Sequence, residues 1–365
     1  MKRKFVLVLF IVVGLLGVKD KAYASSSKLI KIEAGVMHNI ALRDDGTVWM
    51  WGDNTSAQLG DGTKFPSRIP IQVIGLSDVI DVAAGRYHSV ALKRDGTVWA
   101  WGDNIDGQLG DGTITTRYSP VLVSGLSNVV DISCGSRFTL ALKRDGTVWA
   151  WGDNSHGAIG DGTYINKKAP VQVKNILNAA AVEAGGYHAL ALTGNGEVWA
   201  WGNNYEGQLG DGTKMGRSTA VKIMSDVSRV GAGTFNSYAI KKDGTAWAWG
   251  FNDVGQLGIG IKGDSQSSPV QMIEATNVKY ITGGEYHTVV MKNDGTVWVC
   301  GGDMWGELGD GILYNGTDNE KMTLIQLTGI SEAETIGGGL FYTVVLLKDG
   351  SVWGCGRNYT GELGY

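Results

Sequence analysis

Short stretches in which apolar and polar residues alternate recur along almost the whole chain, from residue 28 to residue 365. Within residues 79–124 four such stretches follow one another, at 79–83, 88–93, 97–101 and 120–123. Glycine, proline or an Asp-Gly pair separates them, and Asp95-Gly96 is a strong signal for a two-residue hairpin turn. An alternation of period two over stretches this short favours β-strands over helices. The pattern therefore predicts a unit of four short antiparallel strands.

This unit repeats, and the repeat predicts the architecture. The run Asp-Gly-Thr-Val-Trp-x-Trp-Gly, or a close variant, occurs seven times at intervals of 48–55 residues. Its first residue is Asp45, Asp95, Asp145, Asn195, Asp243, Asp294 and Asp349. A period near fifty is typical of stacked units that cannot bury their apolar faces alone. We therefore expect an all-β fold, a closed seven-bladed β-propeller with mostly four antiparallel strands per blade.

The third stretch of each unit predicts how neighbouring blades pack. Trp99 and Trp101 share one face of it, while smaller side chains occupy the other face. Twelve of the 13 tryptophans stand in such positions, so we expect them to fill the space between blades. The chain starts at a first-type stretch, residues 30–33, and stops at residues 361–365, before a fourth stretch. The last blade is thus predicted to have three strands, or to borrow a segment near Ser25.

The recurring residues resemble the repeat of the regulator of chromosome condensation family. The resemblance lies in the Trp-x-Trp-Gly run, in Asn-x-x-Gly-Gln-Leu-Gly (Asn104 to Gly110), in the Pro-Val stretch and in Ala-Gly-x-x-His (Ala84 to His88). It implies a seven-bladed propeller. The founding eukaryotic member is a nuclear exchange factor for a small GTPase and binds chromatin. Secreted bacterial relatives, among them a beta-lactamase inhibitory protein, use a similar propeller to bind another protein, and this precedent suits the present chain better.

The first residues have a different character. Met1 to Lys4 is basic, residues 5–18 form an apolar run of 14, and Ala22-Tyr23-Ala24 offers a site of small residues. This order is typical of a secretory signal peptide and is too short for a membrane span. We expect residues 1–24 to be a signal peptide cleaved after Ala24 and residues 25–365 to be the propeller, secreted or held in the cell envelope. A retained, uncleaved anchor is the alternative.

Charge and cysteine content narrow the class of partner. The net charge is −4, and it falls to −8 once residues 1–24, with five cations and one aspartate, are removed. An acidic body is a poor candidate for binding nucleic acid. The three cysteines, Cys134, Cys300 and Cys355, are widely spaced and form neither a disulfide framework nor a zinc pattern. Cys300 and Cys355 stand where other copies have the second tryptophan, so they are interpreted as small core substitutes.

No motif in the chain predicts catalysis, a metal or a cofactor. His38, His88, His188 and His287 occupy one position of the repeat, but the other copies place Phe138, Asn236 and Tyr342 there, which does not suit a ring of ligands. The Asp-Gly-Thr runs are better explained as turns than as calcium loops. No nucleophile elbow, paired carboxylates or phosphate loop appears in the sequence. The chain is therefore interpreted as a protein other than an enzyme.

Positions at which the copies differ are the candidates for function, because the residues that recur are explained by the fold. The turns between first and second strands and the loops between third and fourth strands should share one rim of the ring. Aromatic residues and arginine on a rigid rim are typical of protein-binding hot spots. We expect Tyr87, Arg137, Tyr187, Tyr286 and Trp305 to be more exposed than the tryptophans of the repeat. The candidates are Tyr87, Arg137, Phe138, Tyr187, Phe235, Tyr286, Phe341, Phe65, Tyr118, Tyr164, Met304 and Trp305.

Two functional hypotheses of different class follow. The first is a secreted or cell-surface propeller that binds an unknown protein through this rim. The second is a carbohydrate-binding or glycan-processing propeller, which would need acid and base groups converging in one pocket. Nucleotide exchange remains a third possibility by family resemblance. Lysine and arginine residues recur on the opposite rim, and they suggest a further hypothesis, that this rim binds anionic cell-wall polymers.

Overall fold

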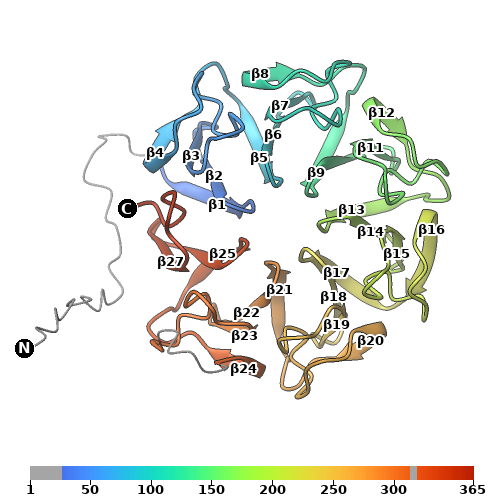
Figure 1. Ribbon diagram of the computed structural model, residues 1–365, viewed down its shortest axis with the longest axis vertical. Coiled ribbons are helices and arrows are strands. Elements are labelled where there is room, and N and C mark those ends of the chain that lie inside the picture. Colours follow the sequence, from blue (N-terminus) through green and yellow to red (C-terminus); the bar gives the residue numbers. More distant parts are fainter. Residues whose placement is uncertain (1–26, 313–318) are drawn as a thin grey trace, which may run out of the picture.

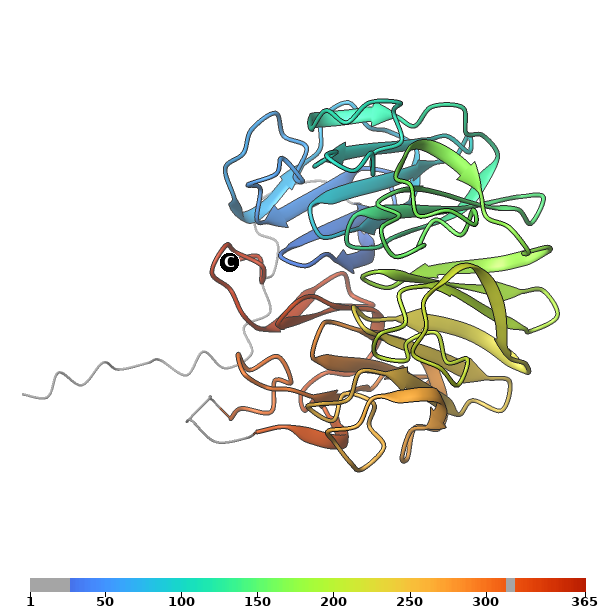
Figure 2. The same ribbon diagram turned by 45° about the vertical axis from the view of Figure 1, so that its right-hand side comes forward.

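The computed structural model describes residues 27–312 and 319–365, and all the regular elements in these ranges are β-strands. Seven sheets stand around a central axis like the blades of a propeller (Figure 1). Figure 2 shows the same ring turned by 45°, with loops on both of its faces. The prediction of an all-β, seven-bladed propeller is confirmed. Among the described residues, no helix has the length and apolarity that a membrane crossing needs.

The strands follow the chain order, four to a blade. Blade one comprises β1 (Leu29–Ala34), β2 (His38–Arg43), β3 (Val48–Gly52) and β4 (Ser67–Gln72). Blade two comprises β5 (Val79–Ala84), β6 (His88–Lys93), β7 (Val98–Gly102) and β8 (Arg117–Leu122). Blade three comprises β9 (Val129–Cys134), β10 (Phe138–Lys143), β11 (Val148–Gly152) and β12 (Lys167–Gln172). Blade four comprises β13 (Ala179–Ala184), β14 (His188–Thr193), β15 (Val198–Gly202) and β16 (Arg217–Met224).

The remaining blades complete the ring. Blade five comprises β17 (Val227–Ala232), β18 (Asn236–Lys241), β19 (Ala246–Gly250) and β20 (Gln266–Gln271). Blade six comprises β21 (Val278–Gly283), β22 (His287–Lys292), β23 (Val297–Gly301) and β24 (Lys321–Gln326). Blade seven comprises β25 (Ala333–Gly338), β26 (Tyr342–Leu347) and β27 (Val352–Gly356). Among the described residues this last blade has three strands, as expected. The segment near Ser25 lies outside the described residues.

Every blade is an antiparallel meander, so its strands pair in the order in which they occur along the chain. The first strand is innermost, as Figure 1 shows for β1, β5 and β9. This meander places the first-to-second turns and the third-to-fourth loops at the same end of each blade. The Asp-Gly hairpins and the crossovers between blades lie at the other end. We call these two ends of the ring the loop rim and the hairpin rim.

The second tryptophan of each Trp-x-Trp run packs between two blades. Trp101 of blade two is fully buried in a cluster that includes Ile40, Leu42 and Leu59 of blade one. Its Nε1 donates a hydrogen bond to the carbonyl oxygen of Gln58, at 2.8 Å. Buried indoles usually find such a partner, because an unpaired N–H is costly. The predicted packing of blade against blade is therefore confirmed for this position.

The first tryptophan of each run behaves differently from the expectation. In blade one this residue, Trp49, is buried and only 9% exposed. In the other six blades it is half-buried: Trp99, Trp149, Trp199, Trp247, Trp298 and Trp353. They stand near the hairpin rim, where in five blades a lysine or arginine lies over the ring. The indoles of the repeat thus divide into a buried set between blades and a set near the hairpin rim, five of which are capped by a cation.

The three cysteines are free thiols. Cys300 is fully buried in the core cluster that also contains Met272. It therefore fills the second-tryptophan position of blade six, as the sequence predicts. Cys355 is half-buried and occupies the same position in blade seven.

Candidate functional site

A row of aromatic rings runs along the loop rim from blade three to blade seven. Ring centroids follow one another at 5.4–6.3 Å, and a final pair closes to 5.2 Å. We call this row the aromatic arc. In order of contact from ring to ring it consists of Tyr205, His156, Tyr187, Phe235, Phe251, Tyr286, Phe341, Trp305 and Tyr359.

The arc is built from two kinds of segment. Tyr187, Phe235, Tyr286 and Phe341 come from the first-to-second turns, and the other five rings come from the loops that follow the third strands. Three of the loop rings, His156, Phe251 and Trp305, each contact the turn ring of the next blade, while Tyr205 and Tyr359 contact another loop ring. His156 of blade three, for example, lies 5.4 Å from Tyr187 of blade four. The arc therefore links five neighbouring blades into one surface.

Backbone hydrogen bonds hold the turns of the arc in place. The carbonyl oxygen of Tyr187 accepts a bond from the backbone N–H of Asn203, and that of Tyr286 accepts one from Gly302. The turns of neighbouring blades also bond to each other, since Gly186 N–H donates to Thr234 C=O at 3.0 Å. A hydrogen-bonded belt of this kind leaves the rings on a rigid base, which reduces the entropy lost when a partner binds.

The exposure of the arc distinguishes it from the buried tryptophans. Tyr205, Tyr359 and Trp305 are 69%, 62% and 40% exposed. Tyr87, Arg137, Tyr187 and Tyr286 are half-buried, whereas the second tryptophan of a run such as Trp201 is fully buried. The expected difference in exposure holds against the second tryptophans. Against the first tryptophans, which are half-buried apart from Trp49, the difference holds for the 40% exposed Trp305.

The rest of the loop rim is more polar. In blades two and three, Arg86 lies over the ring of Tyr87 at 5.3 Å, and Arg137 Nη1 pairs with Asp106 at 3.1 Å. No ring contact joins Tyr87 to the arc among the described residues. Tyr87 and Arg137 therefore belong to a separate, charged part of the rim.

The candidates in the third-to-fourth loops are exposed but scattered. Phe65, Tyr164, Met304 and Tyr118 are 78%, 58%, 57% and 42% exposed. Lys64 lies over the ring of Tyr118 at 5.5 Å. None of the three aromatic rings among them contacts the arc in the part of the chain that the structure describes, whereas Met304 directly precedes Trp305 of the arc. They offer separate contact points around it.

Phe138 does not belong to the rim surface, and its inclusion was wrong. Its side chain is 2% exposed and lies in the core cluster of blades three and four. It begins β10 at the position that holds histidine in four other blades, and the side chain of that position points into the blade. The residue type at this position differs between blades, but the differences lie in the core and not on the rim surface.

The four histidines at this position form hydrogen bonds between neighbouring blades. His38 Nε2 lies 3.0 Å from Ser89 Oγ of the next blade, and Ser89 Oγ donates to the carbonyl oxygen of Gln58 at 2.9 Å. Because the hydroxyl proton goes to that carbonyl, Nε2 must carry the imidazole proton and donate it to Oγ. Burial lowers the pKa of His38 to about 4 and that of His188 to about 3. These imidazoles stay neutral and hold blades together.

Four members of the arc were missed by sequence reasoning: His156, Tyr205, Phe251 and Tyr359. Each lies in or beside the recurring Trp-Gly-x-Asn segment, whose regularity favoured a purely structural interpretation. The sequence does show a difference at the position after this asparagine. Blades four and seven have tyrosine there, whereas blades one, two and five have Thr55, Ile105 and Asp253. Comparing each position of the loop across all copies would have found it.

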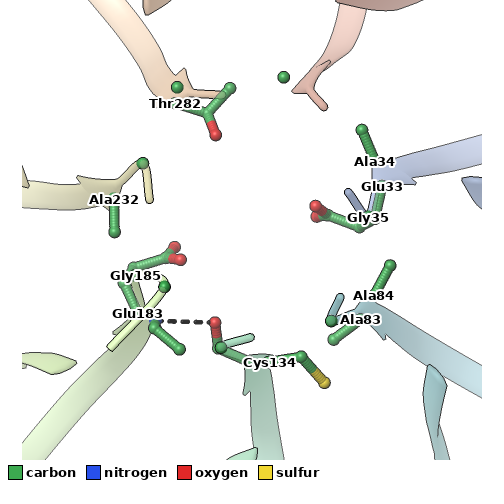
Figure 3. A pocket seen from close by; sticks show the side chains of 18 of the residues that line it. Glu33, Ala34, Gly35, Ala83, Ala84, Cys134, Glu183, Gly185, Ala232 and Thr282 are labelled. Atoms are coloured by element: carbon green, nitrogen blue, oxygen red, sulfur yellow. Dashed lines mark hydrogen bonds between the residues drawn. The ribbon is translucent and has the colours of Figure 1, made fainter. Parts of the chain in front are cut away.

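The axis of the ring holds a cavity of about 690 Å³, lined by the innermost strands. Figure 3 shows Glu33 and Glu183 reaching into it from opposite walls. Lys31 Nζ pairs with Asp81 at 2.6 Å and with Glu33 at 3.1 Å. Burial raises the pKa of Asp131 to about 6 and raises that of Glu183 well above its usual range. Among residues 27–312 and 319–365, no three acidic, histidine or cysteine side chains converge to hold a metal ion.

Comparison with known proteins places the fold in a known group. A family model described as an RCC1-like domain matches residues 13–227 and 77–365. The structure of yeast RCC1 (Prp20) bound to Kap60 has a TM-score of 0.76 at 21% identity, over 94% of this chain and 82% of that one. Human WBSCR16 has a TM-score of 0.75 at 22% identity, over 91% of this chain and 88% of that one. At these identities the likeness shows the fold alone.

Curated relatives match over shorter stretches. The secretion-regulating guanine nucleotide exchange factor of Bos taurus is 33% identical over 91 residues, which is 24% of this chain and 18% of that protein. The X-linked retinitis pigmentosa GTPase regulator homolog of Caenorhabditis elegans is 31% identical over 88 residues, 24% of this chain and 6% of that protein. The matched stretch is thus less than a fifth of either relative.

Proposed function

Because this chain belongs to the family of RCC1-like domains, we propose that it is a non-catalytic scaffold that binds another protein through its aromatic arc. The yeast relative RCC1 (Prp20), which has the same fold, was solved with another protein, Kap60, bound to it. The partner of the present chain is a different question, because fold likeness does not carry a partner across.

The observation that carries the proposal is the continuity of the arc. Nine rings from five blades form one surface, although the repeat itself requires none of them. Tyrosine and tryptophan dominate interface hot spots, since they bury a large area at low entropic cost. The half-buried turn rings would form the centre of such an interface, and the exposed Tyr205, Trp305 and Tyr359 its anchors.

A non-catalytic role is supported by the four histidines of the repeat and by Cys300, because their side chains are buried and take part in packing the blades. The histidines are neutral and bonded between blades, as His38 is to Ser89. The thiol of Cys300 is buried, and burial raises its pKa to about 12, so it is a poor nucleophile at neutral pH. These groups serve the packing of the ring.

We also propose that the protein acts outside the cytoplasm, secreted or held in the cell envelope. The support is the basic, apolar and small-residue order of residues 1–24, which lie outside the described residues. Edman sequencing of protein recovered from the culture medium and from the envelope would test this. A mature N-terminus at Ser25 is the expected result, and recovery of all the protein in the cytoplasm with Met1 intact would contradict it.

The binding proposal is tested by capture followed by mapping. Residues 25–365 serve as bait for culture supernatant and envelope extract, and captured proteins are then added to fresh bait for hydrogen exchange. We expect slower exchange in the turns around Tyr187, Phe235, Tyr286 and Phe341. Protection confined to the Asp-Gly hairpins would place the partner on the other rim and contradict the proposal.

Nucleotide exchange is the second candidate function, and the similarity to the exchange factor of Bos taurus is the observation that favours it. The test is release of labelled GDP from a panel of small GTPases. Acceleration by the wild-type chain and its loss on Trp305→Ala would support exchange through the arc.

A further inference from the structure

The hairpin rim carries a regular array of capped indoles. A cation lies over the first tryptophan of the run in five blades, at 4.1–5.9 Å from the ring centroid. The pairs are Arg43 with Trp49, Lys93 with Trp99, Lys143 with Trp149, Lys241 with Trp247 and Lys292 with Trp298. In blade seven the aliphatic Leu347 and Trp353 pack on the same core cluster instead.

Blade four breaks this array. Thr193 stands where the other blades have lysine, arginine or leucine, and its short side chain is itself buried. Among the residues that the structure describes, no lysine or arginine forms a ring contact with Trp199. The hairpin of this blade also differs, because it reads Thr-Gly-Asn-Gly-Glu where blades two and three read Lys-Arg-Asp-Gly-Thr.

The break in the array coincides with a cavity. A hollow of about 590 Å³ lies against Trp199, between the hairpin of blade four and the crossover that leads into it from blade three. Its size falls within the range of about 300–1,000 Å³ that is usual for small-molecule sites. The hairpin contributes Thr193, Asn195 and Glu197, and the crossover contributes Asn175, Leu177 and Asn178.

The chemistry of the lining selects the kind of ligand. Three asparagine amides each offer both hydrogen-bond donors and acceptors. Trp199 and the 75% exposed Leu177 provide apolar surface beside them. A wall of this composition fits a molecule with an apolar face and a rim of hydroxyl groups.

The charges around the hollow disfavour an ionic ligand. Lys222 Nζ donates a hydrogen bond to Glu197 Oε1, and this bond lowers the pKa of Glu197, so the carboxylate stays ionised and paired. Glu197 is the one ionisable side chain among the residues that line the hollow, and Lys222 balances its charge. The lining therefore offers no unpaired charge to a cation or an anion, and a neutral ligand fits it better.

We propose that this hollow is a binding site for a neutral sugar, with a pyranose ring lying over Trp199 and its hydroxyl groups bonded to Asn175, Asn178 and Asn195. The site lies on the rim opposite the aromatic arc. It is independent of the proposed protein partner, and both could be bound at once.

The test observes Trp199 directly. The chain is labelled with ¹⁵N-tryptophan, the indole N–H signal of Trp199 is assigned by its loss in Trp199→Phe, and the protein is titrated with cellobiose and with N,N′-diacetylchitobiose. We expect at least one disaccharide to shift the Trp199 signal and to saturate at a Kd of about 1 mM or below. The other indole signals should stay in place.

The repeat supplies its own blocking variant. Thr193→Lys restores the residue found in blades two and three, so the blade should fold, and the new side chain should cover Trp199 and weaken sugar binding at least about tenfold. Ser127→Lys adds the same charge to an exposed site on the same rim and should bind as the wild type does.

Three results would overturn the proposal. One is the absence of a Trp199 shift with both disaccharides. Another is unchanged sugar binding by Thr193→Lys. The third is a shift caused by N-acetyl-lysine methylamide and by neither sugar, which would make the hollow a site for cations.

Discussion

At the scale of single residues, the position of an indole within Trp-x-Trp decides what it does. The second tryptophan is fully or almost fully buried, as in Trp101, and its Nε1 bonds to a carbonyl of the preceding blade. The first is half-buried and in most blades capped by a cation. Trp305 lies outside the run and is 40% exposed. Three environments thus give one residue type three roles.

Truncation of a second tryptophan should therefore be costly. Trp101→Ala empties the space between blades one and two and removes the bond to Gln58, so we expect a loss of about 3–5 kcal/mol in unfolding free energy. Trp305→Ala is the control and should cost less than about 1 kcal/mol, since surface changes usually cost little. Urea melts measure both. Equal losses would contradict the assignment of roles.

Two acids in blade six depart from the repeat in a way that affects stability. Asp303 and Glu307 stand where blade two has Asn104 and Gln108. Burial raises the pKa of Asp303 to about 6 and that of Glu307 to about 7. Because these pKa values are higher in the folded than in the unfolded chain, the folded state binds more protons between about pH 4 and 7. Stability from this pair is therefore lost as the pH rises through that window.

The variant Asp303→Asn with Glu307→Gln should remove this pH dependence. We expect it to be more stable than the wild type by about 1–3 kcal/mol at pH 8 and to match it near pH 4. Glu362→Gln is the control in blade seven, where the acid lies 3.4 Å from Arg357, and it should give no gain. Thermal melts across this pH range would show the difference. A gain that is the same at pH 4 and pH 8 would argue against the titration.

At the scale of elements, one asparagine holds the loop after the third strand in every blade except blade six, where Asp303 takes its place. Asn204 is fully buried, and its Oδ1 accepts a bond from Leu209 N–H at 2.9 Å. Its Nδ2 donates to the carbonyl oxygens of Thr213 and Met215 at 3.0 and 3.1 Å. The amide thus supplies hydrogen-bond partners for backbone groups of the irregular loop. Tyr205, the next residue, is presented on that framework.

Removal of this amide should loosen the loop without opening the ring. Asn204→Ala leaves several buried groups unpaired, so we expect a cost of about 1–3 kcal/mol. Hydrogen exchange in residues 205–216 should become faster, while the same loops of other blades keep their rates. Tyr205→Ala, which removes an exposed side chain from the same loop, should leave exchange unchanged. Faster exchange in every blade would mean that the loop has no independent stability.

The sequence could predict the elements well, because period, turn chemistry and alternation all agree for this fold. It predicted Tyr187, Phe235, Tyr286 and Phe341 at the rim, since the meander fixes which segments share an end. It could not predict which of them touch, because contact depends on how far each loop leans over the next blade. Phe138 was misplaced because the sequence does not show which way the first residue of a strand points.

At the scale of the whole molecule, the ring is closed by contacts between the last and the first blade. Trp51 Nε1 and Asn39 Nδ2 of blade one both donate to the carbonyl oxygen of Glu362, at 3.0 and 2.6 Å. The hydroxyl of Tyr342 in blade seven lies 3.0 and 2.9 Å from the carbonyl oxygens of Gly35 and His38, which share its single proton. The Trp51 bond repeats the pattern of other blade junctions, whereas the Tyr342 bonds replace the histidine-to-hydroxyl contact found in four of them. The closed ring presents two separate faces, the aromatic arc on one and the Trp199 hollow on the other.

The basic residues of the hairpin rim also find an explanation at this scale. Arg43, Lys93, Lys143, Lys241 and Lys292 cap indoles, so their charges are partly used within their own blades. This structural use accounts for their recurrence without a polymer ligand.

On this view the repeated residues build the ring, and the aromatic arc binds the partner. The most direct test is the affinity of the captured partner for two double variants, measured by calorimetry. Tyr187→Ala with Tyr286→Ala should weaken binding at least about 100-fold, since each hot-spot aromatic is worth about 2 kcal/mol or more. Leu177→Ala with Ile273→Ala removes exposed apolar side chains from the hairpin rim and should bind as the wild type does. Unchanged affinity in the first variant, or a loss confined to the second, would contradict this view.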